Sequence, residues 1–254
     1  MRDAATVAPP DGPVPAMAHT VTIFDLDGTI ARGDTFLRFL GFVLRRRPRR
    51  LARCAGLPGM VLGAGLGAVS RDDAKQRLLK AIVGGCTHAV IENLAVAFVR
   101  KCRTTMLKSP ALDRIAWHRS QGHRLILATA SLDLYANTLG EALGFDDIVC
   151  TRAVYDGDLV SGGLQGGNLH GEAKVAAIRA LPAFNTPTAP FVFAYTDHHS
   201  DLPLLLFADR GVAVDPTRRL ARLAAEHGLT TEYWTSRGRR GRRHAGGRPR
   251  LIEA

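Results

Sequence analysis

The stretch "HTVTIFDLDGTIARGDTF", residues 19–36, places two carboxylates at the end of a run with the composition of a buried β-strand. Val21–Phe24 form the apolar run, and Asp25 and Asp27 follow it one residue apart. On an extended strand both side chains would point the same way, so their negative charges would repel each other. Two interpretations are open at this point. Either the strand ends with Asp27 and Gly28 in a turn, or the carboxylate pair binds a divalent cation beside a phosphate.

The length and composition are typical of a globular α/β protein with room for an inserted unit. The chain has 254 residues, of which 46% are hydrophobic, and a chain of this size can bury a full core. Its cysteines show no CxxC or other metal-ligand spacing, which argues against a zinc site or a disulfide framework and favours a reducing cytoplasm. They are Cys54, Cys86, Cys102 and Cys150. Residues 1–19 are rich in Pro and Ala and lack an apolar core, so we expect a disordered leader, with Met17 as an alternative start.

The formal net charge of +11 comes largely from two arginine clusters. The first spans Arg45–Arg53, and the second holds seven arginines within residues 237–250. Because the second cluster is rich in glycine and has no apolar period, residues 236–254 are predicted to be a basic disordered tail. Such a tail is suited to binding nucleic acid or an anionic membrane surface; alternatively it is a solvated extension. The excess charge therefore says little about the folded domain.

Strand-like and helix-like segments alternate along most of the chain. Runs rich in Val, Ile and Phe predict strands at residues 19–26, 123–130, 147–155, 190–197 and 211–215. Apolar residues spaced three and four apart predict helices at residues 132–143, 172–181, 200–208 and 217–227. This alternation indicates an α/β fold with a Rossmann-like, mostly parallel sheet covered by helices on both faces. In such sheets ligands bind at the carboxyl ends of the strands.

The segment between the first two strands, residues 33–118, has no strand signal and is far longer than a usual connection. We expect it to be an inserted, all-helical cap, so that the α/β core comprises residues 20–32 and 119–235. Its apolar stretch, residues 57–69, is shorter than the about 20 residues that a membrane span requires. That stretch either packs within the cap or lies on a membrane surface beside Arg45–Arg53.

Polar side chains follow three of the predicted strands at their carboxyl ends, and a lysine opens a helix between two of them. The residues are Asp25 and Asp27, Thr129 and Ser131, Thr196, Asp197 and Asp201, and Lys174 of "GEAKV". Phosphoryl transfer requires a nucleophile, ligands for the phosphate oxygens, neutralisation of charge and a Mg²⁺ site. A carboxylate, a hydroxyl, a lysine and an acidic pair supply these functions.

At this point the sequence resembles the haloacid dehalogenase superfamily, in particular its phosphoserine-phosphatase-like branch with a helical cap after the first strand. The matching motifs, in chain order, are "FDLDGT", "ILATAS", "GEAKV" and "YTDHHSDLP". Each motif alone is weak, but four in this order on the expected elements are specific. The resemblance covers about residues 20–230 and leaves both termini outside it.

The resemblance implies a role for each carboxylate of the first motif. Asp25 would be the nucleophile that forms an aspartyl-phosphate, and Asp27 would be the general acid and then the general base. The charge of Asp25 would raise the pKa of Asp27 and so keep a protonated fraction for the leaving group. Mg²⁺ would be held by the Asp25 carboxylate, the Asp27 backbone carbonyl and Asp197. A dication and a phosphoryl group between the two carboxylates would explain why both are tolerated.

The other motifs would bind the phosphate. Thr129, with backbone N–H groups at Gly28 and Ala130, would hold phosphate oxygens, while Lys174 neutralises charge and Asp201 orients Lys174 or a water on the metal. Each assignment has a structural alternative. Thr129 would then be an ordinary strand residue with Ser131 capping the next helix, Lys174 a surface residue, and Asp201 an acid favoured at a helix N-terminus.

The chain departs from this branch near the predicted substrate end. His198 and His199 stand where that branch has small residues, either as exposed loop residues or as groups that touch substrate at the rim. Asp34 and Arg77 fall near the positions that bind a substrate's amino and carboxylate groups in that branch. Alternatively, Asp34 is a helix N-cap and Arg77 a solvated helix residue.

The leading hypothesis is a Mg²⁺-dependent, cytoplasmic phosphomonoester phosphatase for a small phosphorylated metabolite, such as phosphoserine or histidinol phosphate. A second hypothesis is a nucleic-acid-associated or membrane-peripheral phosphatase or binding protein that uses the arginine-rich tail. A third is a phosphate-binding protein without turnover, and the intact set of motifs argues against it.

Overall fold

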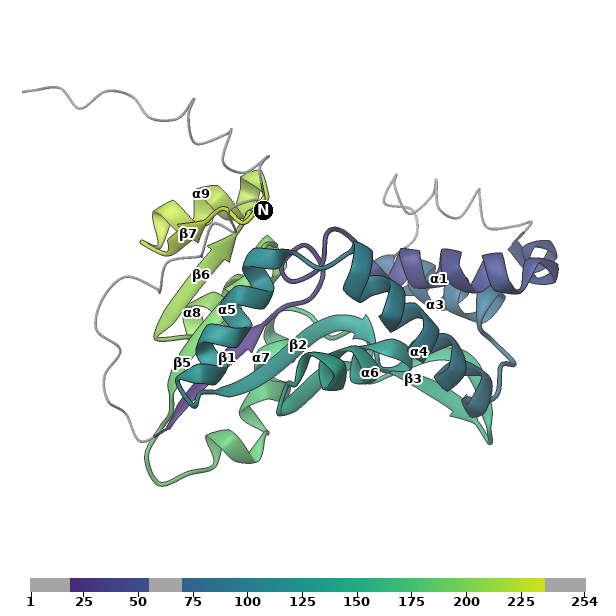
Figure 1. The fold of residues 1–254 in the computed structure, drawn as a ribbon, viewed down its shortest axis with the longest axis horizontal. Helices are drawn as coiled ribbons and strands as arrows, with labels where there is room; N and C mark the ends of the chain where they lie inside the picture. Colours follow the sequence, from purple (N-terminus) through teal and green to yellow (C-terminus); the bar gives the residue numbers. More distant parts are fainter. Residues whose placement is uncertain (1–18, 55–69, 236–254) are drawn as a thin grey trace, which may run out of the picture.

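A computed structural model describes residues 19–54 and 70–235 and shows a twisted α/β sheet with a helical cap at one end (Figure 1). The predicted leader up to residue 18, the apolar stretch 57–69 and the basic tail lie outside the described residues. None of the helices within 19–54 and 70–235 is long and apolar enough to cross a bilayer.

The sheet of the described residues has seven strands in the order β4-β3-β2-β1-β5-β6-β7, and every neighbouring pair is parallel except β3 and β4. The strands are β1 (Thr20–Phe24), β2 (Arg124–Leu132), β3 (Asp147–Asp156), β4 (Leu159–Gln165), β5 (Phe191–Thr196), β6 (Arg210–Val214) and β7 (Thr230–Glu232). The predicted α/β class and mostly parallel sheet are confirmed. Strands β4 and β7 were not predicted, because one is interrupted by glycines and the other is only three residues long.

Helices cover both faces of the sheet, and each face has its own apolar cluster. Side chains alternate along β1, so Phe24 packs on one face and Ile23 on the other. The Phe24 face is covered by α5 (Ser109–Ser120) and α6 (Asp133–Leu143). The Ile23 face is covered by α7 (Glu172–Arg179), α8 (Leu202–Phe207) and α9 (Arg218–Glu226), with the short 3₁₀ helices η2 (Pro182–Phe184) and η3 (His199–Asp201) between them.

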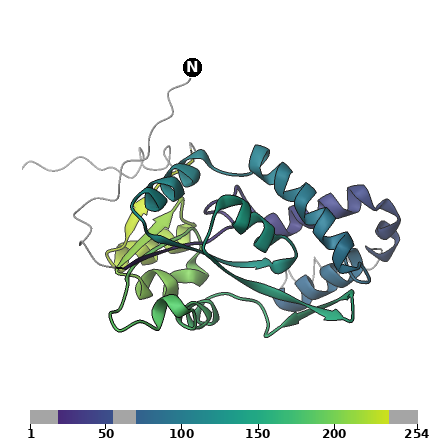
Figure 2. The same ribbon diagram turned by 60° about the horizontal axis from the view of Figure 1, so that its bottom comes forward.

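The cap consists of α1 (Thr35–Arg46), the 3₁₀ helix η1 (Pro48–Cys54), α3 (Arg71–Ile82) and α4 (His88–Thr105). It packs on α6 through aromatic side chains, with the Phe39 and Phe98 rings centred 4.8 and 5.3 Å from the ring of Tyr135. The cap is also hydrogen-bonded to the antiparallel pair of strands β3 and β4, which we call the β3–β4 arm. The N–H of Gly85 donates to the carbonyl of Val160 (2.8 Å). Figure 2 shows this arm reaching beneath the cap helices. The cap therefore sits firmly on one end of the core.

A glycine explains how α3 approaches β4 so closely. Gly162 has a φ of +97°, and a Cβ atom there would lie 2.5 Å from the Cβ of Lys80 on α3. Any larger residue at position 162 would push the cap helix away. The glycines of β4 thus form a surface on which a cap helix docks.

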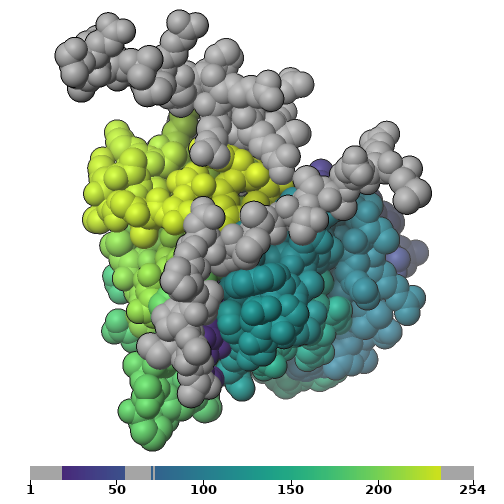
Figure 3. Space-filling model, turned by 60° about the vertical axis from the view of Figure 1, so that its left-hand side comes forward, coloured from purple at the N-terminus to yellow at the C-terminus, as the bar shows by residue number. Residues whose placement is uncertain are grey.

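Helix α5 lies mostly within the predicted insertion of residues 33–118 but packs on the sheet. Its Ala111 and Ile115 are buried in the same apolar cluster as Phe24 of β1, and the helix contacts β2. We therefore propose that the cap ends before α5. On this side of the sheet the C-terminal elements lie beside α5 (Figure 3), and Arg114 of α5 pairs with Glu232 of β7 at 3.0 Å.

Two arginines of the first arginine cluster bind carbonyl groups at the C-terminal end of α3. Arg50 donates to the carbonyls of Ile82 and Gly84 (3.0 and 2.8 Å), and Arg53 donates to Gly84 (3.2 Å). Carbonyls at a helix C-terminus lack intrahelical partners and favour positive charge. These two arginines thus stabilise the end of α3.

Candidate active site

The predicted motif residues meet at the carboxyl ends of β1, β2 and β5, around a cavity of about 540 Å³. Seven residues predicted as core site residues or phosphate ligands line it or its floor: Asp25, Asp27, Gly28, Ala130, Lys174, Asp197 and Asp201. The remaining lining residues are Gly33, Asp34, Asn168, His170, His198, His199 and Ser200. Segments far apart in sequence therefore build a single pocket.

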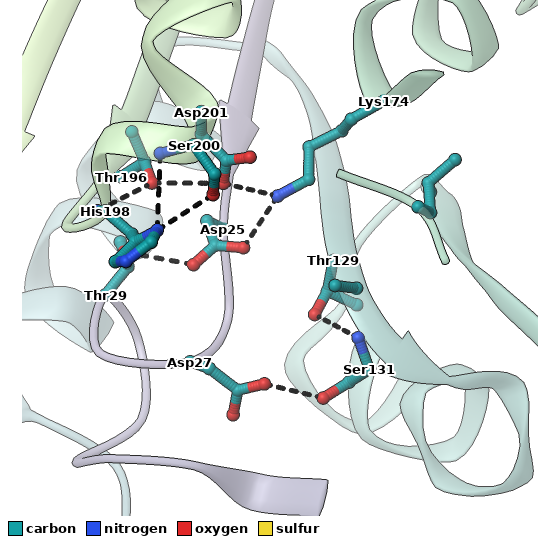
Figure 4. A network of polar contacts seen from close by, with 12 residues as sticks. Asp25, Asp27, Thr29, Thr129, Ser131, Lys174, Thr196, His198, Ser200 and Asp201 are labelled. Atoms are coloured by element: carbon teal, nitrogen blue, oxygen red, sulfur yellow. Dashed lines mark hydrogen bonds and ion pairs between the residues drawn. The ribbon is translucent and has the colours of Figure 1, made fainter. Parts of the chain in front are cut away.

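Asp25 sits at the floor of this cavity, directly after β1, and is buried. Its backbone N–H continues the sheet by donating to the carbonyl of Tyr195 (2.9 Å). Its Oδ1 accepts from Lys174 (2.9 Å) and its Oδ2 from Thr29 (3.3 Å). Figure 4 shows these groups converging on the Asp25 carboxylate. The side chain is held in one orientation at the end of its strand.

Lys174 is a buried cation shared by two carboxylates. Its Nζ lies 2.9 Å from Asp25 and 2.6 Å from Asp201, and the side chain is 1% exposed. The N-cap residue of α7 is Gly171, whose φ of +57° suits glycine and whose N–H reaches Asp201 at 3.5 Å. Burial lowers the pKa of Lys174, but Asp25 and Asp201 outweigh this effect and hold the pKa above its ordinary value. Lys174 is therefore charged, and it is not the surface residue of the structural alternative.

The carboxylates are more numerous than Lys174 can neutralise. Burial raises the pKa of Asp25 to about 8, and repulsion from Asp201, Asp197 and Asp27 adds to the effect against the attraction of Lys174. Burial also raises the pKa of Asp197 to about 7. These carboxyl groups can therefore all be ionised at neutral pH only if a cation besides Lys174 joins them.

Asp27 is held by a hydroxyl network that sequence reasoning missed. Its Oδ1 accepts from the N–H of Thr35 (2.6 Å), and its Oδ2 accepts from Ser131 (2.7 Å). Ser131 in turn contacts the hydroxyls of Thr35 (2.9 Å) and Tyr135 (2.8 Å). Burial raises the pKa of Asp27, although these hydrogen bonds oppose the shift. The predicted elevation is confirmed in direction, but its main cause is burial rather than the neighbouring Asp25.

The structural alternative is wrong for Ser131 but not for Asp201. Ser131 does not cap α6, whose N-cap is Leu132 without a side-chain hydrogen bond. Asp201 is the N-cap residue of α8; its side chain makes no cap hydrogen bond and binds Lys174. Asp201 therefore stands at a helix N-terminus while its carboxylate belongs to the cavity network.

Gly28 allows Asp197 to approach the loop that follows β1. Gly28 has a φ of +77°, and a Cβ atom at this position would lie 2.0 Å from Oδ2 of Asp197. Its carbonyl accepts from Lys108, which also pairs with Asp215 at 2.8 Å. Lys108 is almost fully buried and was not predicted. The glycine is thus required by both backbone conformation and space.

The donor set fits a hard divalent cation. Among residues 19–54 and 70–235, no group of three or more Asp, Glu, His or Cys side chains has a ready-made metal geometry. Asp25 and Asp197 nevertheless line one cavity, in which carboxyl groups outnumber lysines. The absence of a side chain at Gly28 leaves room for the Asp197 carboxylate beside the loop that follows β1. Two carboxylates and a backbone carbonyl, completed by water and substrate oxygens, suit Mg²⁺.

Thr129 is fully buried and does not line the cavity, whereas Ala130 does. The Thr129 hydroxyl accepts from the N–H of Ser131 at 3.0 Å, which holds the end of β2 in a tight turn. Its contact with a phosphate therefore stays a prediction.

The cap contributes differently from the sequence-based expectation. Asp34 lines the cavity and also caps α1 by accepting from the N–H of Leu37 (2.8 Å). Arg77 is exposed on α3 and is not among the lining residues, so the geometry gives its predicted role no support. Two residues earlier, Lys75 donates to the Ala130 carbonyl (2.5 Å) and to Asn168 (2.6 Å).

The two histidines belong to the cavity wall rather than to an exposed loop. His198 and His199 are half-buried, line the cavity, and have ring centres 4.1 Å apart. His198 also caps η3, because its Nδ1 accepts from the N–H of Ser200 (3.3 Å), and the Ser200 hydroxyl lies 2.8 Å from the same atom. Their position favours the rim alternative, and contact with substrate stays a prediction.

Solved structures share the fold. A protein of unknown function from Bordetella pertussis Tohama I superposes with a TM-score of 0.70 at 20% identity, covering 85% of this chain and 98% of that one. A phosphoserine phosphatase solved as a phospho-aspartyl intermediate analogue has a TM-score of 0.56 at 14% identity, covering 80% and 90%. At these identities the likeness concerns the fold alone.

Sequence comparisons assign the family. The protein CicA of Caulobacter vibrioides is 30% identical over 187 residues, which is 73% of this chain and 82% of CicA. Phosphoserine phosphatase SerB1 of Mycobacterium tuberculosis is 25% identical over 238 residues, covering 88% of this chain and 77% of SerB1. The family model for haloacid dehalogenase-like hydrolases matches residues 22–206, which span all four motifs. The resemblance to the phosphoserine-phosphatase-like branch is thereby confirmed, and this chain belongs to the haloacid dehalogenase-like hydrolase family.

Proposed function

We propose that this phosphatase of the haloacid dehalogenase family hydrolyses phosphomonoesters of small metabolites with Mg²⁺, through an aspartyl-phosphate on Asp25. The observation that carries the proposal is the buried chain Asp25–Lys174–Asp201, which fixes a carboxylate at the floor of a cavity beside Asp27 and Asp197. A purely structural ion pair would not require the further carboxylates. Family membership and the name of SerB1 point the same way.

The first half-reaction forms a bond from an Asp25 carboxylate oxygen to phosphorus and breaks the bond from phosphorus to the leaving oxygen. Asp27 donates its proton to that oxygen, so the alcohol leaves neutral. Its raised pKa suits this task, because a protonated fraction persists closer to neutral pH. Ser131 and Thr35 hold the carboxyl group in place while the proton moves.

The second half-reaction returns the protein to its starting state. Asp27, now ionised, takes a proton from water, the water oxygen attacks phosphorus, and the bond to Asp25 breaks. Lys174 offsets negative charge beside Asp25 throughout. Mg²⁺, held by Asp25, Asp197 and the Asp27 carbonyl, would supply further positive charge to the phosphoryl oxygens. Lys174 together with that cation favours the ionised Asp25 that attack requires.

A small substrate fits the cavity better than a polymer does. The cavity of about 540 Å³ lies in the range of small-molecule sites. Asp34 is an anionic group on its cap side, suited to an ammonium or imidazolium on the substrate. Phosphoserine and histidinol phosphate both carry such a cation and are our candidate substrates. We also propose a cytoplasmic location, since all four cysteines are free thiols.

The decisive experiment follows phosphate on the protein. Wild type should hydrolyse a panel of phosphorylated metabolites with Mg²⁺ and lose activity in EDTA. Asp25→Asn should lower turnover at least about a thousandfold, because a neutral amide replaces the nucleophile. Asp27→Asn should instead accumulate an adduct of roughly 80 Da with a good leaving group, since attack remains possible while hydrolysis is slowed.

Intact mass after acid quench, followed by peptide mapping, locates the adduct. We expect it on the segment Thr20–Arg32. Substantial Mg²⁺-dependent hydrolysis by Asp25→Asn, or an adduct on Thr129 or a histidine, would overturn the assignment of Asp25.

A further inference from the structure

Lys75 links the cap to the catalytic cavity through two neutral oxygen atoms. It projects from α3, and its Nζ donates to the carbonyl of Ala130 (2.5 Å) and to Oδ1 of Asn168 (2.6 Å). Both acceptors belong to the core and line the cavity. A lysine that orders its long side chain inside a protein normally does so for a specific partner.

The contact with Ala130 connects Lys75 to Asp27. The connection runs through the Ala130–Ser131 peptide bond and then through the hydrogen bond from Ser131 to Asp27. The Ala130 carbonyl and the Ser131 N–H are the two ends of one peptide unit, which is planar and moves as a body. Lys75 holds one end, and the Thr129 hydroxyl holds the other at 3.0 Å. The Ser131 side chain then donates to Asp27 at 2.7 Å. The orientation of this peptide therefore sets the hydrogen bond that positions the Asp27 carboxyl group.

The second contact anchors the same peptide through the core. The Thr151 hydroxyl lies 2.9 Å from the Ala130 carbonyl and 3.2 Å from Asn168 Oδ1, and it accepts from the N–H of Leu169 at 3.0 Å. Lys75, Ala130, Thr151 and Asn168 thus close a ring of polar contacts. The ring joins α3 of the cap to β2, β3 and the loop ahead of α7.

The charge of Lys75 strengthens this connection. An ammonium donor forms shorter and stronger hydrogen bonds than a neutral amine. Burial lowers the pKa of Lys75 to about 8, against the attraction of Asp27, Asp72 and Asp34. The group is thus mostly protonated at neutral pH, and it is fully partnered only when the cap rests on the core.

We propose that Lys75 is a positioning residue through which the seated cap aligns Asp27 for proton transfer, by holding the Ala130–Ser131 peptide. The inference rests on the proposed function, because it assigns Asp27 as the general acid. It adds that a cap residue without a place in the catalytic motifs controls that acid. When the cap lifts, the peptide loses its ammonium partner and Asp27 loses alignment.

A leaving-group comparison separates positioning of the acid from a general structural role. An alkyl phosphomonoester needs its leaving oxygen protonated, whereas p-nitrophenolate is a stable anion that leaves without a proton. Lys75→Met keeps the length and removes the donor and the charge. In single-turnover experiments we expect the rate of leaving-group release to fall about tenfold or more for the best alkyl phosphomonoester, and less than about twofold for p-nitrophenyl phosphate. Leaving-group release is the rate to compare, because hydrolysis of the aspartyl-phosphate uses Asp27 with either substrate.

Matched variants make the test specific. Lys101→Met is the same change at an exposed site on the cap helix α4 and should leave both rates within about twofold. Lys75→Gln, which retains an N–H donor without charge, should give an intermediate loss on the alkyl substrate and also serves if Lys75→Met folds poorly. Asn168→Ala combined with Lys75→Gln should be non-additive, because the two side chains share one ring.

Equal losses on the two substrates, or no loss on either, would overturn the role of Lys75 and leave the proposed function standing. If wild type hydrolyses neither substrate and forms no adduct on Asp25, the proposed function fails and this inference fails with it.

Discussion

Lys174 of the core and Lys75 of the cap both reach the catalytic cavity or its wall, and they differ in what they contact. Lys174 of α7 binds two carboxylates, Asp25 and Asp201, and is 1% exposed. Lys75 of α3 instead donates to two neutral oxygens, those of Ala130 and Asn168, and lies 5.4 Å from the centre of the Phe36 ring. Burial lowers the pKa of both, but only the paired carboxylates of Lys174 reverse the shift. The core lysine is thus a permanent charge, whereas the cap lysine is a weaker and releasable contact.

This difference separates chemistry from control. Removing Lys174 leaves buried anions without a cation, which costs far more than removing a donor to neutral oxygens. The core half of the site should therefore tolerate almost no change, and the cap half should tolerate changes that alter substrate preference. The predictions below test this order of effects.

The largest effect is expected at Lys174. Lys174→Met should lower kcat/KM at least about a thousandfold on every phosphomonoester, because Asp25 then lacks the cation that offsets its charge. It should also lower the free energy of unfolding by about 2–5 kcal/mol at neutral pH. Steady-state kinetics and urea denaturation measure the two quantities. Lys101→Met, an exposed lysine on α4, is the matched control and should change neither.

If Lys174→Met kept its activity within tenfold of wild type, Lys174 would not be essential to the chemistry as we propose. A loss limited to alkyl substrates would also contradict the proposal, because we expect that pattern only for Lys75.

The second prediction concerns the charge that Lys174 leaves unbalanced. Burial raises the pKa of Asp25 to about 8 and that of Asp197 to about 7, so both hold protons in the metal-free protein as the pH falls through this range. Mg²⁺ must displace those protons, and its affinity should fall by about tenfold or more between about pH 8 and about pH 6. The increase in Tm caused by Mg²⁺ should accordingly be larger at the higher pH.

The same pKa shifts predict how the stability of the metal-free protein changes with pH. Carboxyl groups whose pKa is raised by folding bind more protons in the folded state, so their ionisation at rising pH reduces stability. In EDTA their contribution to the free energy of unfolding should decrease as the pH rises from about 4, near their ordinary pKa, to about 8, and should then level off. Thermal melts with and without Mg²⁺ at each pH isolate this contribution. A Mg²⁺-induced shift in Tm that does not change with pH would contradict the proposed ligands.

The core half of the site could be predicted from the sequence because its geometry is fixed by strand ends. Once Asp25, Thr129 and Asp197 are placed after parallel strands, the register of β1, β2 and β5 brings those ends together. Lys174 follows from the motif that opens α7. These residues combine a recognisable spacing with a fold that allows one arrangement.

The cap half could not be predicted in the same way. Whether Lys75 or Arg77 faces the core depends on the rotation of α3, and that rotation is set by its packing against β4 at Gly162. The N–H of Thr35 reaches Asp27, and the hydroxyl of Tyr135 reaches Ser131, only because α1 and α6 meet there. Such contacts arise from tertiary packing between segments about a hundred residues apart, and no local pattern encodes them.

A smaller effect is expected at Asp34, which faces the cavity from the start of α1. Asparagine caps helices about as well as aspartate, so Asp34→Asn removes the charge and keeps the hydrogen bond to Leu37. KM for an amino-acid phosphate should rise about tenfold, while p-nitrophenyl phosphate turnover changes less than about twofold. Asp113→Asn, an exposed site on α5, is the control. Equal changes with both substrates would indicate that Asp34 contributes to catalysis rather than to substrate preference.

The smallest effect is expected at the basic tail, residues 236–254, which carries none of the motif residues and follows the last described contacts of the core. Trp234 and Thr235 already bind Asp215 through their backbone N–H groups at 3.0 and 3.1 Å, so a truncation after Ser236 keeps this anchor. The kcat on a small phosphomonoester should stay within about twofold, since neither lysine nor any carboxylate of the cavity is touched. If the tail serves the second hypothesis, binding to nucleic acid or to anionic vesicles should weaken steeply with salt in the full chain and disappear in the truncated one. Loss of most small-substrate activity in a folded truncated protein would instead show that the tail acts on the site. The tail would then contribute to activity alongside the core and the cap.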